Sequence, residues 1–181
     1  NLANSVYAQA DARWPRTESI TWLLSAQGLH QQDVGAAYAG EFQTGMGGLL
    51  GSVIWNGFTL TMGGTITDHG ADIYNPWASY PGYTSLMEED CNVAGEKAWM
   101  VGVAYDFATV GLNGLSAFMN HSESWTDESR GLSDPEQVEV DFTVDFKPRG
   151  WWQGLSLRAR AALVRNSLSL KGTDYEDFRI I

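Results

Sequence analysis

The chain has 181 residues, which suits a single domain over 1–181 with no internal boundary, and 22 acidic residues against 11 Lys and Arg give a formal net charge of −11. This acidic balance argues against a nucleic-acid surface. The single cysteine, Cys91, excludes an internal disulfide framework and argues against a cysteine-rich zinc site. The sequence lacks the basic start and apolar run of a signal peptide, and no continuous apolar run suits a transmembrane helix.

The first two predicted strands, residues 5–14 and 20–30, alternate between two faces. Successive residues of a strand point to opposite sides, so each strand has one apolar and one polar face. The apolar faces carry Val6, Ala8, Ala10, Ala12 and Trp14 in the first strand, and Trp22, Leu24 and Ala26 in the second.

Residues 42–67 contain no charged side chain and are rich in Gly and Thr. The Asn56-Gly57 pair in the middle predicts a two-residue hairpin turn, in which both residues take positive φ. The segment is therefore predicted to form two strands. One face carries Leu49, Val53, Trp55, Phe58, Leu60, Met62 and Ile66, and the other is rich in Thr and Ser.

The same alternation continues through residues 98–107, 137–146 and 155–163, with the weakest strand at 115–120 and the start of another at 178–181. This gives roughly nine strands of about 9–11 residues, the length that a tilted membrane-crossing strand needs. Connections after Trp14, Trp55, Phe107 and Phe146 are short, whereas those around 32–40, 69–95, 122–136 and 165–175 are long. Strict alternation of short and long predicts an all-β, antiparallel up-and-down meander, with aromatic residues clustered at the short-turn end.

Charged residues are distributed unevenly between the two predicted faces. Every Lys and Arg is predicted to lie in a connection or on a polar face, as Arg13, Arg158, Arg160 and Arg179 do, and no Asp or Glu is expected on an apolar face. Hydrocarbon would enforce this pattern, because a lipid-facing Arg or Lys costs about 2–4 kcal/mol at the bilayer midplane, but a dry core would enforce it too. The polar faces carry Thr, Ser, Gly and Gln, which favours a water-filled lumen in a transmembrane β-barrel over a soluble ligand-binding β-barrel.

Residues 72–107, "DIYNPWASYPGYTSLMEEDCNVAGEKAWMVGVAYDF", resemble a loop and strand of the OprD-type porins, the substrate-specific outer-membrane channels of pseudomonads and their relatives. The strands "GLSLRAR" and "EVDFTVDFKP" are also similar to elements of that family. The resemblance covers essentially the whole chain but only the C-terminal part of the family's barrel of about 18 strands. It implies a bacterial outer-membrane location and uptake of small, often carboxylate-bearing nutrients such as amino acids or aromatic acids.

The resemblance also implies a loop folded into the lumen opposite a row of arginines. Arg158 and Arg160, with Arg13 and Arg179, match wall positions; the alternative is that they neutralise wall acids such as Asp141 or Asp145. The loop at 75–90 offers side chains that could contact a solute, although its aromatic residues could instead pack the loop down. These candidates are Tyr80, Tyr83, Thr84, Ser85 and Asp90.

Metal binding and catalysis have little support in the sequence. Glu88, Glu89 and Asp90 are consecutive and lack the spaced ligands of a calcium loop, and no nucleophile motif occurs, so we expect no enzyme activity, metal or cofactor. The expected partners are small anionic or zwitterionic solutes, outer-membrane lipid and lipopolysaccharide, with the protein a monomer or loose trimer. A non-conducting structural barrel is the alternative within the membrane class.

Overall fold

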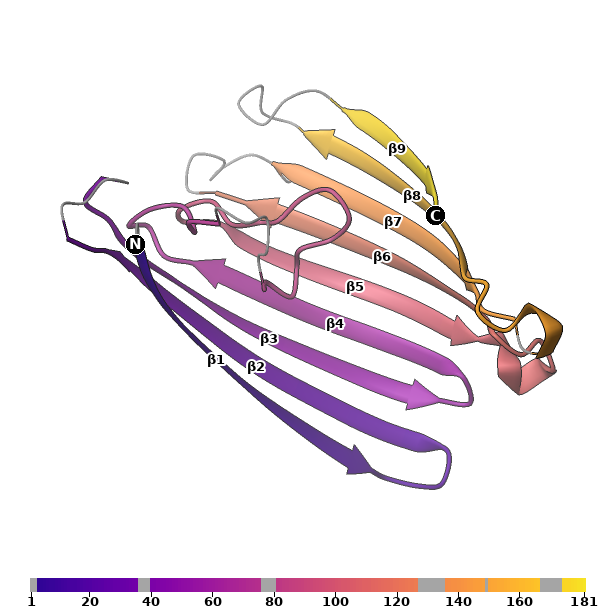
Figure 1. The fold of residues 1–181 in the computed structure, drawn as a ribbon. Coiled ribbons are helices and arrows are strands. Elements are labelled where there is room, and N and C mark those ends of the chain that lie inside the picture. Colours follow the sequence, from indigo (N-terminus) through magenta and orange to yellow (C-terminus); the bar gives the residue numbers. More distant parts are fainter. Residues whose placement is uncertain (1–2, 36–39, 76–80, 127–135, 149, 167–173) are drawn as a thin grey trace.

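The computed structural model describes residues 3–35, 40–75, 81–126, 136–148, 150–166 and 174–181. Nine antiparallel strands form one curved sheet in chain order, each paired with its sequence neighbour (Figure 1). No helix among the described residues is long and apolar enough to cross a bilayer. The strands are β1 (Ala3–Pro15), β2 (Ile20–Asp33), β3 (Gln43–Trp55), β4 (Phe58–Thr67), β5 (Lys97–Asp106), β6 (Leu115–Trp125), β7 (Gln137–Phe146), β8 (Leu157–Asn166) and β9 (Tyr175–Ile180).

The predicted hairpin between β3 and β4 is confirmed. Asn56 and Gly57 have φ values of 46° and 83°, the pair of positive angles that a tight antiparallel turn requires. Trp55 and Phe58 are then the first paired residues of the two strands. Phe58 also contacts Tyr105 of β5, with ring centroids 4.3 Å apart, so aromatic side chains do gather at this end of the sheet.

The two faces of the sheet differ as the alternation predicted. We call the face covered by residues 68–75 and 81–96 of the β4–β5 loop the inner face, and the opposite one the outer face (Figure 1). On the outer face Leu60 is 56% exposed and Val103 is 43% exposed. On the inner face Thr44 and Thr143 are fully buried. Leu60 and Val103 therefore point away from the covered face, and the buried apolar cluster between the loop and the sheet is small, consisting of Leu29, Met46 and Ile73.

The predicted absence of charge from the outer face is wrong at the long-loop end. Lys97, Glu123 and Arg165 belong to strands and pair in register with Ile66, Trp99 and Val138, which lie on that face. The side chains of His121 and Glu123 are within hydrogen-bond distance there, with Nε2 and Oε1 3.0 Å apart. The strands are longer than the apolar pattern suggested, so their last residues reach the level at which the apolar band ends.

Strand β6 shows the same effect most clearly. The sequence predicted a short strand at 115–120, but β6 continues to Trp125 and pairs with β5 and β7 throughout. The extension "HSESW" is mostly polar, so its composition is typical of a loop. Its backbone nevertheless pairs with β5 and β7. Similarly, β9 begins at Tyr175 and not at 178.

The strict alternation of short and long connections also needs correction. Connections 16–19 and 56–57 are short, but 147–156, at the same end of the sheet, is longer than 167–174 at the other end. The added length at the short-turn end forms the 3₁₀ helices η1 (Phe107–Val110) and η2 (Gly150–Trp152). The side chain of Asp106 caps η1 by accepting the N–H of Ala108 at 2.9 Å. Such compact turns leave no periodic signal in the sequence.

Candidate functional site

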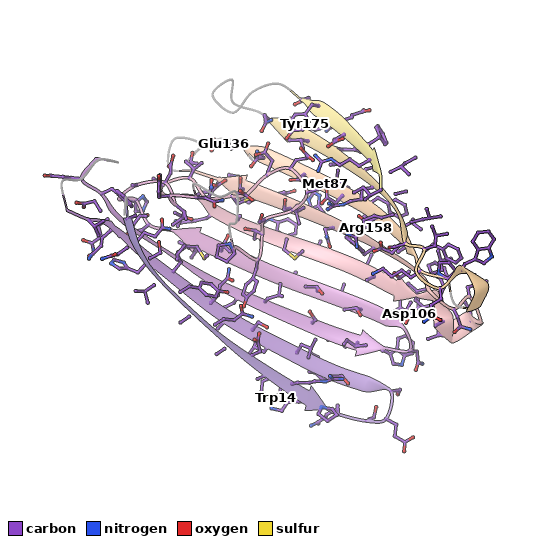
Figure 2. The ribbon with its side chains drawn as sticks, viewed as in Figure 1. Trp14, Met87, Asp106, Glu136, Arg158 and Tyr175 are labelled. Atoms are coloured by element: carbon purple, nitrogen blue, oxygen red, sulfur yellow. The ribbon has the colours of Figure 1, made fainter. Side chains whose placement is uncertain are left out.

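The β4–β5 loop crosses the inner face and contacts strands on both sides of its own (Figure 1, Figure 2). Near its start, the side chain of Gln31 on β2 donates to the carbonyl of Tyr74 at 3.0 Å and accepts the N–H of Tyr74 at 2.8 Å. Thr44 of β3 donates to the carbonyl of Ala71 at 2.6 Å. These bonds use polar side chains that a lipid-facing or dry surface would not carry, so the inner face is built to hold this loop.

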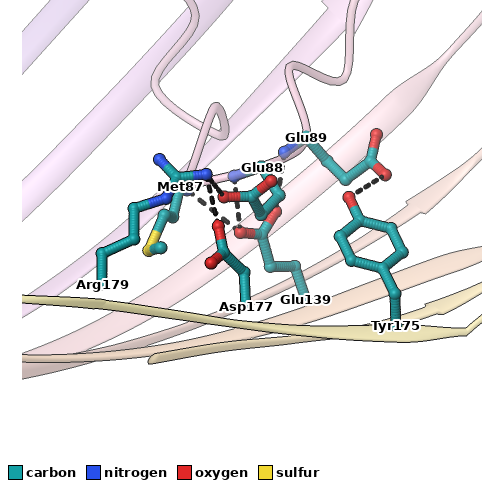
Figure 3. A network of polar contacts seen from close by, with 7 residues as sticks. All are labelled: Met87, Glu88, Glu89, Glu139, Tyr175, Asp177 and Arg179. Carbon is teal, nitrogen blue, oxygen red and sulfur yellow. Dashed lines mark hydrogen bonds and ion pairs between the residues drawn. The ribbon is translucent and has the colours of Figure 1, made fainter. Parts of the chain in front are cut away.

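The far end of the loop is bound by Glu139 of β7 (Figure 3). One carboxylate oxygen accepts the backbone N–H groups of Met87 and Glu88 at 3.0 and 2.9 Å, and the other accepts that of Glu89 at 2.9 Å. The Glu139 side chain is fully buried. Three hydrogen bonds therefore satisfy the oxygens of a side chain that would otherwise be costly to bury.

Strand β9 contributes a second set of contacts to the same part of the loop. The guanidinium of Arg179 forms ion pairs with Glu88 of the loop and Asp177 of its own strand, and the hydroxyl of Tyr175 donates to Glu89 at 3.1 Å (Figure 3). Burial raises the pKa of Glu88 above its usual value, a hydrogen bond with Asp177 adds to the rise, and the charge of Arg179 opposes it. The contact between the loop and β9 therefore contains more acidic than basic side chains.

The predicted loop residues mostly bond within the loop or to the wall. Thr84 is fully buried with its hydroxyl 2.6 Å from that of Thr65 on β4, and Ser85 donates to Asp90 at 2.6 Å. These contacts favour the packing role for Thr84, Ser85 and Asp90. Tyr83 is half-buried, and burial, more than the nearby charge of Asp11, raises the pKa of its hydroxyl. Tyr80 lies outside the described residues.

The four predicted arginines differ in their surroundings. Arg158 makes a two-pronged ion pair with Asp145, with Nε 2.7 Å from Oδ1 and Nη2 2.9 Å from Oδ2, so it fits the neutralising alternative. Arg160 pairs in register with Thr143 and Arg179, and its buried Nε has no hydrogen-bond partner among the described residues. Arg13 is exposed on β1, at the opposite edge of the sheet.

Unsatisfied polar atoms gather around Arg160. Besides its Nε, the hydroxyl of Thr143 and the Oδ1 of Asp141 are buried without a partner in the part of the chain that the structure describes. Buried polar atoms normally find partners, so the hydrogen bonding of this part of the inner face is incomplete within the described residues. Among the described residues, no group of three His, Cys, Asp or Glu side chains could hold a metal ion.

Sequence reasoning missed Glu139, Tyr175 and Asp177. It placed Glu139 on a polar strand face, but the loop residues that it binds lie about 50 positions earlier, and no local spacing indicates such a contact. The sequence does not reveal that the loop buries Glu139.

Comparison with known proteins identifies the family. The model of the OprD family of outer membrane porins matches residues 1–181. The chain belongs to this family. Its members are substrate-specific channels of the bacterial outer membrane, so the chain is part of an outer-membrane porin. No curated protein sequence gives a significant match.

Solved structures agree on the fold. Pseudomonas aeruginosa OccK9 (OpdG) matches with a TM-score of 0.87 at 22% identity, covering 98% of this chain and 46% of its own. P. aeruginosa OpdK with vanillate gives 0.86 at 20%, covering 98% and 47%, and Acinetobacter baumannii OccAB3 gives 0.85 at 19%, covering 98% and 47%. The chain thus spans about half the length of these porins, and its nine strands correspond to part of an 18-stranded barrel.

Proposed function

We propose that this chain forms part of a passive, selective channel for small carboxylate-bearing nutrients such as amino acids or aromatic acids. The observation that carries the proposal is the row of guanidinium and carboxylate groups on the inner face of β7, β8 and β9, beside the loop that covers this face (Figure 2). In a narrow lumen such groups act on a passing solute more strongly than they would in bulk water.

Arg160 is the arginine of β8 and β9 best placed to bind a solute carboxylate, because, unlike Arg158 and Arg179, it forms no ion pair with an acid among the described residues. A guanidinium matches a carboxylate with two parallel hydrogen bonds. The similar channel OpdK was crystallised with vanillate, an aromatic carboxylate, which supports the wider class.

The remaining predicted contacts have weaker support. Arg158 and Arg179 are already paired with acids, and Arg13 lies at the far edge of the sheet. Tyr80, Tyr83, Thr84, Ser85 and Asp90 stay predictions, as do a monomeric or loosely trimeric state and binding of lipopolysaccharide by the acidic loops.

The test is uptake by the intact channel reconstituted in liposomes, with a panel of carboxylates, amino acids and neutral sugars. The double variant Arg158→Ala with Arg160→Ala should slow anionic and zwitterionic solutes more than sugars. Lys97→Ala is the matched control, because Lys97 is a cation on the outer face. An equal loss for charged and neutral solutes would reject the role of the arginines.

The rival function is a non-conducting structural barrel. The network between loop and wall would then serve only to close the lumen. Single-channel recording separates the two, since the absence of any conductance from the intact wild-type protein would favour the rival.

A further inference from the structure

We propose that Glu139 is the positioning residue of the constriction: its carboxylate holds the loop backbone at residues 87–89 against β7 and thereby sets how wide the channel opens. This inference rests on the proposed channel function. In this proposal Glu139 positions the loop and does not contact the solute.

The geometry of the contact is selective for a carboxylate. The N–H groups of Met87, Glu88 and Glu89 are consecutive in the chain, and all three donate to the two oxygens of Glu139 within 3.0 Å. Consecutive backbone N–H groups that converge in this way form a concave binding site for an anion. Here the anion is a side chain of the wall, and its full burial keeps competing water away.

Residues 86–90, which we call the loop end, have few other contacts with the wall. The start of the loop is bonded to β2 and β3, through Gln31 and Thr44, and its middle to β4 through Thr65. For residues 86–90, the hydrogen bonds to the wall that the structure describes all go to β7 and β9. Of these, the three bonds to Glu139 and a contact of Asp141 with the Met87 N–H involve the backbone, whereas Arg179 and Tyr175 bind the flexible side chains of Glu88 and Glu89. The position of the backbone at the loop end therefore depends chiefly on Glu139.

An amide can replace this group only in part. Glutamine has one acceptor oxygen, and its NH₂ group would meet the N–H of Glu89 donor to donor. Glu139→Gln should therefore release part of the loop end, and Glu139→Ala should release more of it. Asp145→Asn is the matched control, since Asp145 lies on the same strand and face but bonds Arg158, and no loop residue among those described.

The first readout is the native thiol of Cys91, which is buried in the loop beside the carbonyl of Thr84. In the intact channel, with any other cysteine replaced, a polar maleimide should label Cys91 at least about ten-fold faster in Glu139→Ala than in the wild type. Glu139→Gln should fall between the two, and Asp145→Asn should label at the wild-type rate.

The second readout is single-channel conductance in planar bilayers. Both Glu139 variants should show larger or fluctuating conductance and faster uptake of large neutral sugars, while still folding as heat-modifiable barrels in gels. Unchanged labelling and unchanged conductance in a folded Glu139→Ala variant would overturn the proposal. If the wild type itself does not conduct, the channel function fails, but the labelling experiment still decides whether Glu139 holds the loop.

Discussion

At the scale of single residues, Arg158 and Arg160 show how two similar side chains on one strand face acquire different roles. They lie two residues apart, yet Asp145 engages both prongs of Arg158, while Arg160 keeps a buried donor unpaired among the described residues. A guanidinium that is already paired with a carboxylate has fewer free N–H groups with which to bind a solute.

We therefore expect Arg160→Ala to reduce uptake of carboxylate solutes by up to about ten-fold, the value of one charge-assisted hydrogen bond, and Arg158→Ala to reduce it less. Initial uptake rates of an amino acid and a neutral sugar in liposomes measure the difference. A larger loss from Arg158→Ala would contradict the assignment.

Gly57 gives a prediction about stability. Its φ of 83° strains any residue with a side chain, and an added Cβ would lie 2.8 Å from the Cγ2 of Thr109. Gly57→Ala should destabilise the β3–β4 hairpin by about 1–2 kcal/mol or more. Denaturant unfolding of the intact porin in lipid measures this, with Gly111→Ala, also at positive φ but with open space around it, as a control for the strain alone.

Residue pairs were predictable from the sequence only where they are local to the sheet. The pairing of Arg158 with an acid such as Asp145 followed from two neighbouring strands with alternating polar faces. The contact of Glu139 with the loop did not, because it joins a strand to residues about 50 positions away across an irregular segment.

At the scale of elements, the β4–β5 loop is held to the wall by acids whose protonation affects its docking. Burial in the docked loop raises the pKa of Glu88 above its value in a free loop. The docked state therefore binds the Glu88 proton more tightly than the released state does. This contribution to docking is present at pH values below the ordinary Glu pKa of about 4.3 and is lost as pH rises through the raised value.

We expect loop fluctuations, recorded as conductance noise, to increase as pH rises from about 4 towards neutrality. Glu88→Gln should reduce this pH dependence, since it removes one of the titrating groups. A channel that becomes noisier as the solution is acidified over the same range would contradict the sign.

Strands were the elements that the sequence predicted best. Alternation fixed the faces of β4, β5 and β7, because lipid and a polar interior select opposite side chains at successive positions. It failed at the ends, as in β6, where polar residues continue the ladder beyond the apolar band. The resemblance implied a loop folded into the lumen, but the contacts of residues 68–75 and 81–96 with the wall were not predictable, since this segment has no regular period.

At the scale of the whole molecule, the described sheet is open. Strand β1 pairs only with β2 and β9 only with β8 among the described residues, so two long edges keep unpaired backbone groups. Lipid cannot satisfy such groups. The similar porins are about twice as long, which agrees with a barrel closed by further strands.

The 181-residue chain produced alone in detergent should therefore associate through its edges, and should not behave as a monomer. Light scattering after size-exclusion chromatography measures this, with an intact porin of the family as the control. A monodisperse monomer with native-like strand content would show that the edges are satisfied in some other way.

The path of the β4–β5 loop also bears on how such a barrel is made. The loop leaves from the fourth strand and returns to the fifth, but its end is fixed by groups on the seventh and ninth. Contacts between distant parts of a chain form late, after the intervening chain has been ordered. We therefore expect a nascent barrel to insert with its passage unobstructed and to narrow only when its later strands have arrived, so that permeability control is among the last properties acquired during biogenesis.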